Sequence, residues 1–293
     1  MELVLGIDGG GTSCRAALAT LDGRILSRAT SGAANIRTDL TGARASIVEA
    51  ARLAFVEAGR DPGAIASTPA LLGLAGSNVG TYRRQLEAIL PFSRAIVETD
   101  SQIALEGALG PADGAIAILG TGTAFLVRRG GTARPVGGWG FLIGDQGGGA
   151  RIGRDLFEET LLAYDSIREA TPLTAALLKV FNDNPRDIVE FTTTAKPRDF
   201  GGFAPMVFEH AEKSDAVAEL ILRRAVDAVE ASLGVLGLRD DDPLCLLGGL
   251  APLIERRLSV QYRAKVRPPL QDALGGAVAM AVRAFAPGAR VDG

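Results

Sequence analysis

The sequence begins with an apolar run that leads directly into three consecutive glycines. Residues 2–8 read ELVLGID and residues 9–11 are all glycine. A continuous apolar run predicts a buried strand, and the glycines predict a tight turn into a second strand at 13–21. The dipeptide 22–23, Asp-Gly, is a strong hairpin signal that leads to a third strand at 24–30. We therefore expect the chain to open with three antiparallel strands.

Helices and strands then alternate along the chain. The expected elements are a helix at 39–58, a strand at 69–74, a helix near 79–90, a strand at 95–98 and a helix after Asp100. Alternation of this kind is typical of parallel strands covered by helices.

The opening pattern returns after residue 110. Strands are expected at 115–119, 124–128 and 132–136, with a Gly-Thr-Gly-Thr turn between the first two. This echo predicts an α/β fold of two domains with related topology that face each other across a cleft. We place the domains at 1–110 and 111–271, and expect a C-terminal helix in 272–293 to pack back on the first domain.

The second half is richer in helical pattern. Four prolines between residues 150 and 238 divide it into separate helices, each proline being expected near a helix start: Pro172, Pro185, Pro197 and Pro205. A strand is expected at 244–247, followed by a Gly-Gly turn and a helix.

Composition excludes several classes of function. The 293 residues carry a formal net charge of −3, which provides no broad positive field for nucleic acid or an anionic membrane. No apolar run is long enough to span a bilayer and the start lacks a basic signal region, so we expect a cytoplasmic protein. Cys14 and Cys245 are expected to be buried, reduced thiols. His210 is the only histidine, which disfavours a Ser-His-Asp triad or a two-His zinc site.

The turn at residues 8–12, Asp-Gly-Gly-Gly-Thr, is the first candidate site. Glycines let backbone N–H groups converge on an anion, and a threonine hydroxyl adds a donor, so we interpret it as a phosphate-binding hairpin rather than a plain turn. The GxxxxGK[ST] loop is absent because no lysine follows a glycine, and GxGxxG fails because Cys14 stands where its third glycine belongs.

Asp100 is the second candidate. It follows an expected strand and precedes an expected helix, where open α/β sheets build their sites. Its carboxylate could accept a proton from an attacking hydroxyl, or it could simply cap the helix. Position alone does not separate these two roles.

Glycine-rich turns between residues 120 and 149 form the third candidate, and residues 246–252 a weaker fourth. Asp145 could hold a sugar hydroxyl or water-bound Mg²⁺, or be an ordinary turn residue. Trp139, the only tryptophan, could line a pocket or pack in the core.

Taken together, these stretches resemble the N-acetylglucosamine kinase and BadF/BadG/BcrA/BcrD ATPase family, within the superfamily of sugar kinases, Hsp70 and actin. The resemblance covers nearly the whole chain, and its pieces occur in family order: LGIDGGGTSCRAAL, SGAANI, ETDSQIALEGA, ILGTGTAFL, GGWGFLIGDQGGGARIG, GGFAP, LLGGLAP and DALGGAV. It implies two actin-like (ribonuclease H-like) domains around a central cleft, and phosphorylation of an amino sugar by ATP.

The resemblance also implies a role for each motif. The adenine nucleotide would be bound by Gly9, Gly10, Gly11, Thr12, Thr121, Gly122, Thr123, Gly248 and Gly249. The sugar would be bound by Asn35, Asp100, Gly138, Trp139, Gly140 and Asp145. Mg²⁺ would lie near Asp8, and Asp100 would be the general base. The expected acceptor is the 6-hydroxyl of N-acetylglucosamine or glucosamine, and the expected assembly is a homodimer.

Two departures and two alternatives stand beside this interpretation. Gln146 replaces the glutamate of a common GDEG motif, and two cysteines with one histidine cannot supply the zinc motif of the ROK sugar kinases. The alternatives are a BadF-type, ATP-driven activator of a dehydratase or reductase, which needs cysteines for an iron–sulfur cluster, and a sugar or nucleotide sensor without turnover.

Overall fold

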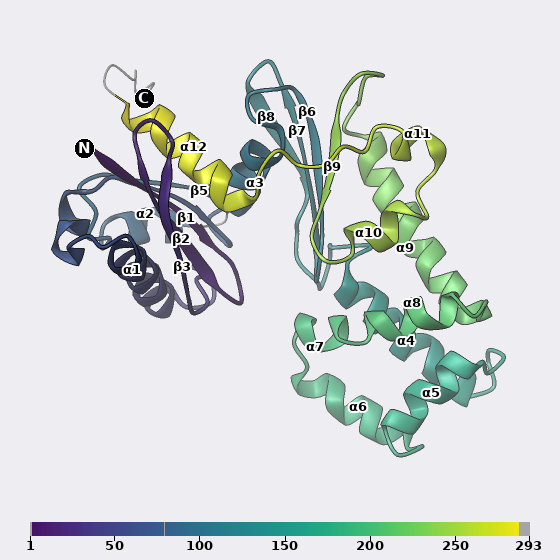
Figure 1. Ribbon diagram of the computed structural model, residues 1–293. Coiled ribbons are helices and arrows are strands. Elements are labelled where there is room, and N and C mark those ends of the chain that lie inside the picture. The colour runs from purple at the N-terminus through teal and green to yellow at the C-terminus, as the bar shows by residue number, and fades with distance from the viewer. Residues whose placement is uncertain (1, 79, 287–293) are drawn as a thin grey trace. The chain divides into compact units, whose positions relative to one another are not determined.

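The computed structural model describes residues 2–78 and 80–286 (Figure 1). The chain divides into two compact units. Unit 1 consists of residues 1–112 and 268–293, and unit 2 of residues 113–267. The first and last parts of the chain therefore belong to the same unit.

Unit 1 is built on a five-stranded mixed sheet in the order β3-β2-β1-β4-β5. Its strands are β1 (Leu3–Gly9), β2 (Cys14–Thr20), β3 (Ile25–Ser31), β4 (Ala70–Leu74) and β5 (Ala95–Thr99). The first three are antiparallel to one another, and β1, β4 and β5 run parallel. The expected opening of three antiparallel strands is confirmed.

Helices cover both faces of this sheet. They are α1 (Leu40–Glu57), the 3-10 helix η1 (Pro62–Ser67), α2 (Tyr82–Glu87), α3 (Asp100–Leu109) and α12 (Ala273–Phe285). Alternation along β1 explains the layers, since successive strand side chains point to opposite faces. Leu5 packs in one cluster with Phe55 of α1, whereas Val4 packs in another with Ala277 of α12.

Unit 2 repeats the strand pattern in a four-stranded sheet of order β8-β7-β6-β9. The strands are β6 (Gly114–Leu119), β7 (Thr123–Arg129), β8 (Thr132–Gly137) and β9 (Leu244–Leu247). Strands β6, β7 and β8 form an antiparallel meander, and β9 joins β6 in parallel as β4 joins β1. The echo between the two halves is thus present in the sheets.

The helices of unit 2 form the larger part of its core. They are α4 (Gly149–Tyr164), α5 (Pro172–Val180), α6 (Pro185–Thr194), α7 (Pro197–Gly201), α8 (Ala204–Ala211), α9 (Ala216–Gly234), α10 (Ala251–Glu255) and α11 (Val260–Arg263). Each of the four prolines occupies the first or second position of its helix, as expected. Buried side chains of α4 and α9, such as Leu156 and Ile221, join those of the sheet, such as Phe125, in one cluster.

Some expected boundaries were wrong. The helix expected near 79–90 spans only Tyr82–Glu87, because Gly80 has a φ of +69° that no α-helix accommodates; residue 79 lies outside the described residues. The segment 272–293 is helical over α12, and residues 287–293 also lie outside the described residues.

In the described parts of the chain, no helix combines the length and the apolar character needed to cross a membrane.

Candidate functional site

Two predicted carboxylates lie at one edge of the unit 1 sheet. Strands β1, β4 and β5 run parallel, so their carboxyl ends meet at the same edge. Asp8 is the penultimate residue of β1, and Asp100 follows β5 as the first residue of α3. The negative charge of Asp8 acts on Asp100, which places the two groups in one electrostatic environment.

Asp100 does not cap its helix, so that alternative was wrong. The N-cap of α3 is Thr99, whose hydroxyl accepts from the N–H of Gln102 at 3.1 Å. The Asp100 carboxylate instead accepts from the adjacent N–H of Ser101 at 2.8 Å. Asp100 is exposed to solvent, although protein surrounds it on most sides. Water therefore still reaches the carboxylate, and its desolvation is incomplete. That desolvation, and next the charge of Asp8, raise the pKa of Asp100 above the ordinary aspartate value.

The glycines of the first hairpin have different roles. A Cβ on Gly9 would lie 2.6 Å from the side chain of Leu74 and 3.0 Å from that of Ala34, so packing requires glycine there. A Cβ on Gly11 would meet nothing within 4 Å, and both Gly11 and Thr12 are exposed. The tip of the hairpin is therefore open for a ligand, while its base is closed by packing.

Asn35 lies beside this hairpin. The N–H of Ala34 donates to the carbonyl of Gly10 at 2.8 Å, which ties the loop that carries Asn35 to the turn. The Asn35 side-chain oxygen accepts from the N–H of Arg37 at 3.1 Å and lies next to Gly76, just beyond the end of β4. The structure thus brings Asn35 and the glycine hairpin together at the edge that carries Asp8.

Arg15 binds Asp8, a contact that the sequence reasoning missed. Its Nε and Nη2 donate to Asp8 Oδ2 at 3.1 and 2.5 Å, and its Nη1 donates to Asp272 Oδ2 at 2.7 Å. Burial tends to lower the pKa of Arg15, but its bonds to the two carboxylates raise it, so it is a fixed cation. The signal for the first contact was available, because a hairpin turning at 10–13 pairs position 8 with position 15.

The second glycine hairpin lies at the matching edge of unit 2. The carbonyls of Gly120 and Thr121 accept from the N–H groups of Gly149 and Ala150, at 2.8 and 2.9 Å, so the start of α4 is bonded to the hairpin. Thr121 is exposed, whereas Thr123 is buried and donates its hydroxyl hydrogen to the carbonyl of Gln146 at 3.1 Å. Thr121 therefore faces solvent, and Thr123 holds two loops together.

Gly248 and Gly249 follow β9, whose parallel partner β6 leads into this hairpin. A Cβ on Gly248 would lie 2.4 Å from the carbonyl oxygen of Leu119, and its φ is +95°, so this position requires glycine for structural reasons. Gly249 is exposed, with open space around it. Gly248 is exposed as well, so the backbone at both positions is open to solvent.

Asp145 connects the hairpin with the loop before α4. It adopts a left-handed φ of 58°, which aspartate tolerates better than most residues. Its carboxylate accepts from the N–H of Gly140 at 3.1 Å and from the backbone of Thr123, and a Cβ on Gly122 would clash with it. Burial raises the pKa of Asp145 in spite of these bonds.

Trp139 is not part of the core, since 73% of it is exposed. It lies between Gly138 and Gly140 in the same loop, and Gly138 is likewise exposed. Gln146 donates its side-chain N–H to the carbonyl of Ile143 at 3.3 Å, a bond that a glutamate carboxylate could not form. Gln146 thus adds one hydrogen bond within this loop.

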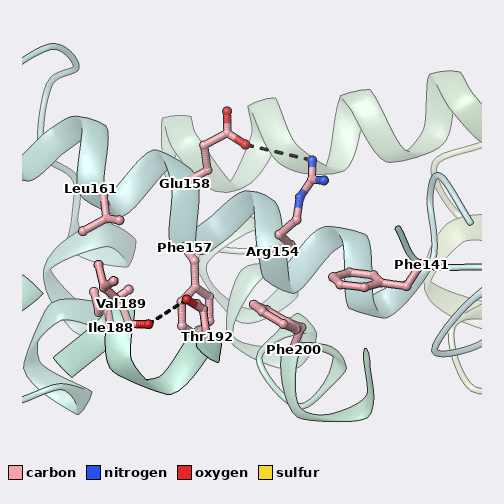
Figure 2. Close-up of a pocket in the computed structure, with 9 residues that line it drawn as sticks. All are labelled: Phe141, Arg154, Phe157, Glu158, Leu161, Ile188, Val189, Thr192 and Phe200. Carbon is pink, nitrogen blue, oxygen red and sulfur yellow. Dashed lines mark hydrogen bonds and ion pairs between the residues drawn. The ribbon is translucent and has the colours of Figure 1, made fainter. Parts of the chain in front are cut away.

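Phe141, which follows Gly140 in the chain, lines a groove of about 440 Å³ (Figure 2). Phe141 stacks on Phe200 of α7 with ring centroids 5.3 Å apart. The lining, shown in Figure 2, consists mainly of apolar side chains of α4 and α6 together with these two rings: Phe141, Arg154, Phe157, Glu158, Leu161, Ile188, Val189, Thr192 and Phe200. The Trp139 loop is thus anchored to the helical part of unit 2 through Phe141.

Oxygen ligands rather than thiols are available for a metal ion. Within residues 2–78 and 80–286, no group of three or more His, Cys, Asp or Glu side chains is arranged to hold one. Mg²⁺ is commonly held by one or two carboxylates with water and substrate phosphates, and the carboxylate of Asp8 fits such a role. Cys14 and Cys245 are both buried thiols outside any disulfide, as predicted. Burial, followed by the charge of Asp8, raises the pKa of Cys14 to about 12.

The family model for BadF/BadG/BcrA/BcrD ATPases matches residues 5–277. The chain belongs to this family. The expected resemblance is confirmed, and the match includes every residue predicted for the site. As the description of the family indicates, its members use ATP.

Curated relatives in the family extend over most of the chain. A glucosamine kinase of Vibrio cholerae is 36% identical over 282 residues, which cover 96% of each chain. An N-acetyl-D-glucosamine kinase of Dictyostelium discoideum is 29% identical and covers 89% of this chain and 91% of its own.

A solved structure has the same fold. It is that of a candidate N-acetylglucosamine kinase from Chromobacterium violaceum, with a TM-score of 0.89 and 29% identity over 96% of this chain and 99% of the other. The α/β fold with two mixed, actin-like sheets is thus shared with this protein.

Proposed function

We propose that this chain is an ATP-dependent sugar kinase that phosphorylates an amino sugar, glucosamine or N-acetylglucosamine, at the 6-hydroxyl. Support comes from the two curated relatives, which are named as kinases of these two sugars and match nearly the whole chain. Glucosamine is the first substrate to test, because the relative named for it has the higher identity.

The observation that carries this proposal is the pair of carboxylates at the edge of the unit 1 sheet. Phosphoryl transfer requires a group that accepts the proton of the attacking hydroxyl, and Asp100, with its raised pKa and its water-accessible position, suits this role. Asp8 suits a different role, because its Oδ2 is bonded to Arg15 and, among the residues that the structure describes, none is bonded to its Oδ1, which a cation could therefore bind. One carboxylate is thus assigned to the sugar and the other to the metal.

Backbone donors at the open hairpin tips would hold the nucleotide phosphates. In unit 1 these are the exposed Gly11 and Thr12, and in unit 2 the exposed Thr121. The open position at Gly249 leaves room for the adenosine. Mg²⁺ held at Asp8 would neutralise negative charge on the transferring phosphoryl group.

The sugar would be bound by polar side chains and by an exposed ring. Asn35 offers an amide beside the first hairpin, and Trp139 offers an apolar face in a loop whose shape Asp145 maintains. Gly138 and Gly140 on either side of Trp139 add no side chains of their own beside this ring.

A coupled assay of ADP release over glucosamine, N-acetylglucosamine, N-acetylmannosamine and glucose tests the function. We expect turnover with one of the first two sugars and at least tenfold lower kcat/KM with glucose. Phosphorus NMR of the product identifies the phosphorylated hydroxyl. Absence of turnover with every sugar, together with tight sugar binding, would instead support a sensor.

The dehydratase-activator alternative needs thiolates that can reach an iron–sulfur cluster. Cys14 and Cys245 are 0% and 1% exposed, which argues against cluster ligation by either. Anaerobic purification followed by iron analysis tests this alternative directly. The expected homodimer and cytoplasmic location stay predictions, to be tested by light scattering and by cell fractionation.

A further inference from the structure

Arg15 is held between two carboxylates that come from opposite ends of the chain. Asp8 lies on β1, Arg15 lies directly opposite it on β2, and Asp272 immediately precedes α12. The side chains of Asp8, Arg15 and Asp272 are 18%, 38% and 42% exposed, so the cluster is only partly screened by water.

The geometry at Asp8 is asymmetric. Both Arg15 nitrogens that face Asp8 bind the same oxygen, Oδ2. A guanidinium facing a carboxylate without other partners favours the fork arrangement, in which two nitrogens bind the two oxygens separately. Here the third nitrogen, Nη1, is bonded to Asp272, and this bond fixes the orientation of the guanidinium.

The net charge of the cluster also depends on Asp272. Two carboxylates and one guanidinium sum to −1, whereas Asp8 and Arg15 alone sum to zero. A neutral pair attracts a divalent cation much less than a cluster that retains a negative charge. Asp272 therefore offsets the charge that Arg15 would otherwise cancel at Asp8.

We propose that Asp272 is a positioning residue that keeps Asp8 available to the nucleotide-bound metal ion. It binds one end of the Arg15 guanidinium, so that Arg15 occupies only Oδ2 of Asp8 and leaves Oδ1 free. This inference rests on the proposed function, since it takes Asp8 to be the residue that holds Mg²⁺.

The two tasks of Asp272 use different oxygens and can be separated. Oδ1 accepts from the N–H of Gly275 at 2.9 Å and caps α12, while Oδ2 binds Arg15. Asparagine caps helices about as well as aspartate, so D272N retains the cap and removes the charge. Asp39 caps α1 in the same way, through Gly42 at 2.8 Å, and D39N is the matched control.

The test measures Mn²⁺ binding in the presence of ADP by electron paramagnetic resonance, alongside the Mg²⁺ dependence of kcat. We expect D272N to weaken Mn²⁺ binding about tenfold and to raise the half-saturating Mg²⁺ concentration in parallel. We expect D39N to leave both unchanged. In the R15Q background the D272N effect is expected to be smaller, because only the loss of the Asp272 charge remains and no guanidinium is left to be positioned.

Equal Mn²⁺ affinities of D272N and D39N would overturn the inference, as would an undiminished D272N effect in the R15Q background. If the wild-type protein binds Mn²⁺ with ADP but phosphorylates no sugar, the proposed function is wrong while the Mn²⁺ comparison still decides the role of Asp272. If it binds no Mn²⁺ with ADP, both are wrong.

Discussion

The backbone N–H of Gly140 donates a hydrogen bond to the carboxylate of Asp145 at 3.1 Å, and this bond closes the loop that displays Trp139. Because the same carboxylate also accepts from Thr123, one side chain connects the Trp139 loop with the second glycine hairpin. The position of the tryptophan ring therefore depends on a residue that need not touch the ligand itself.

Replacing Asp145 by asparagine should loosen this connection. Asparagine tolerates the left-handed φ, but its NH₂ group cannot accept the second backbone N–H. We expect D145N to raise KM for the sugar about tenfold and to lower stability by about 1–2 kcal/mol. Steady-state kinetics and urea unfolding measure the two effects. An unchanged KM would show that the loop keeps its shape without this carboxylate.

Asp100 should make activity and stability depend on pH in opposite ways. A base must be ionised to act, so kcat/KM should fall on acidification with an apparent pKa above 3.8, the ordinary value for aspartate. D100N should lose about 10²- to 10⁴-fold in turnover while ATP binding is retained. Loss of ATP binding in this variant would make Asp100 structural.

Stability follows from the same raised pKa. The native state binds the proton of Asp100 more tightly than the unfolded state does, so ionisation of Asp100 opposes folding. The resulting loss of stability is absent below the ordinary aspartate pKa. It grows as pH rises from that pKa through the pKa of Asp100 in the folded protein. D100N removes the ionisable group. We expect its thermal midpoint to exceed that of the wild type at neutral pH, and the difference to disappear near about pH 4. A midpoint below the wild-type value at neutral pH would contradict this assignment.

Alanine at Gly11 and at Gly9 should have contrasting effects. The structure has room for a Cβ at Gly11, so G11A should change stability by less than about 0.5 kcal/mol but weaken Mg²⁺-ATP binding at least tenfold if phosphates approach the backbone there. G9A should destabilise the protein by about 1–3 kcal/mol through its clash with Leu74 and Ala34. Calorimetric ATP titration and chemical unfolding separate the two. If G11A binds ATP as tightly as the wild type, this hairpin is not part of the nucleotide site.

Phe141 should matter for the sugar because it lies two residues after Trp139 and stacks on Phe200. F141A removes the stacking on Phe200, and we expect a loss of about 1–2 kcal/mol in stability with a several-fold rise in KM for the sugar. V189A is the control on the opposite wall of the groove, where the side chain is 55% exposed, and it should change neither quantity appreciably. Equal effects of the two variants would mean that the stacked pair does not anchor the loop.

The strands, the proline-led helices and the glycine hairpins could be predicted because their signals are local. Apolar runs, Asp22-Gly23 and residues 9–11 each determine the backbone within a few positions. The two roles left open for Asp100 could not be separated, because Thr99 and Asp100 are both good N-cap residues and only the geometry distinguishes them. A single turn such as α11 has too little periodicity to be recognised.

The contacts around Asp8 differ in how far they could be predicted from the sequence. Arg15 was within reach of prediction, since the register of a hairpin follows from its turn. Asp272 was not, because 257 positions separate it from Arg15 and neither residue type indicates a partner at that distance. The same holds for Phe141 and Phe200, whose stacking depends on how α7 returns to α4.

The membership of α12 in unit 1 has a consequence for biosynthesis. Residues 113–267 leave the ribosome as an uninterrupted stretch, whereas the sheet that began the chain lacks its last covering helix until residues 273–285 have emerged. Val4 and Leu71 on that face find their partner Ala277 only after residues 113–267 have been synthesised. Unit 1 is therefore begun before unit 2 but completed after it. A ribosome that stalls before α12 is made leaves an apolar face of the unit 1 sheet exposed to chaperones or to aggregation.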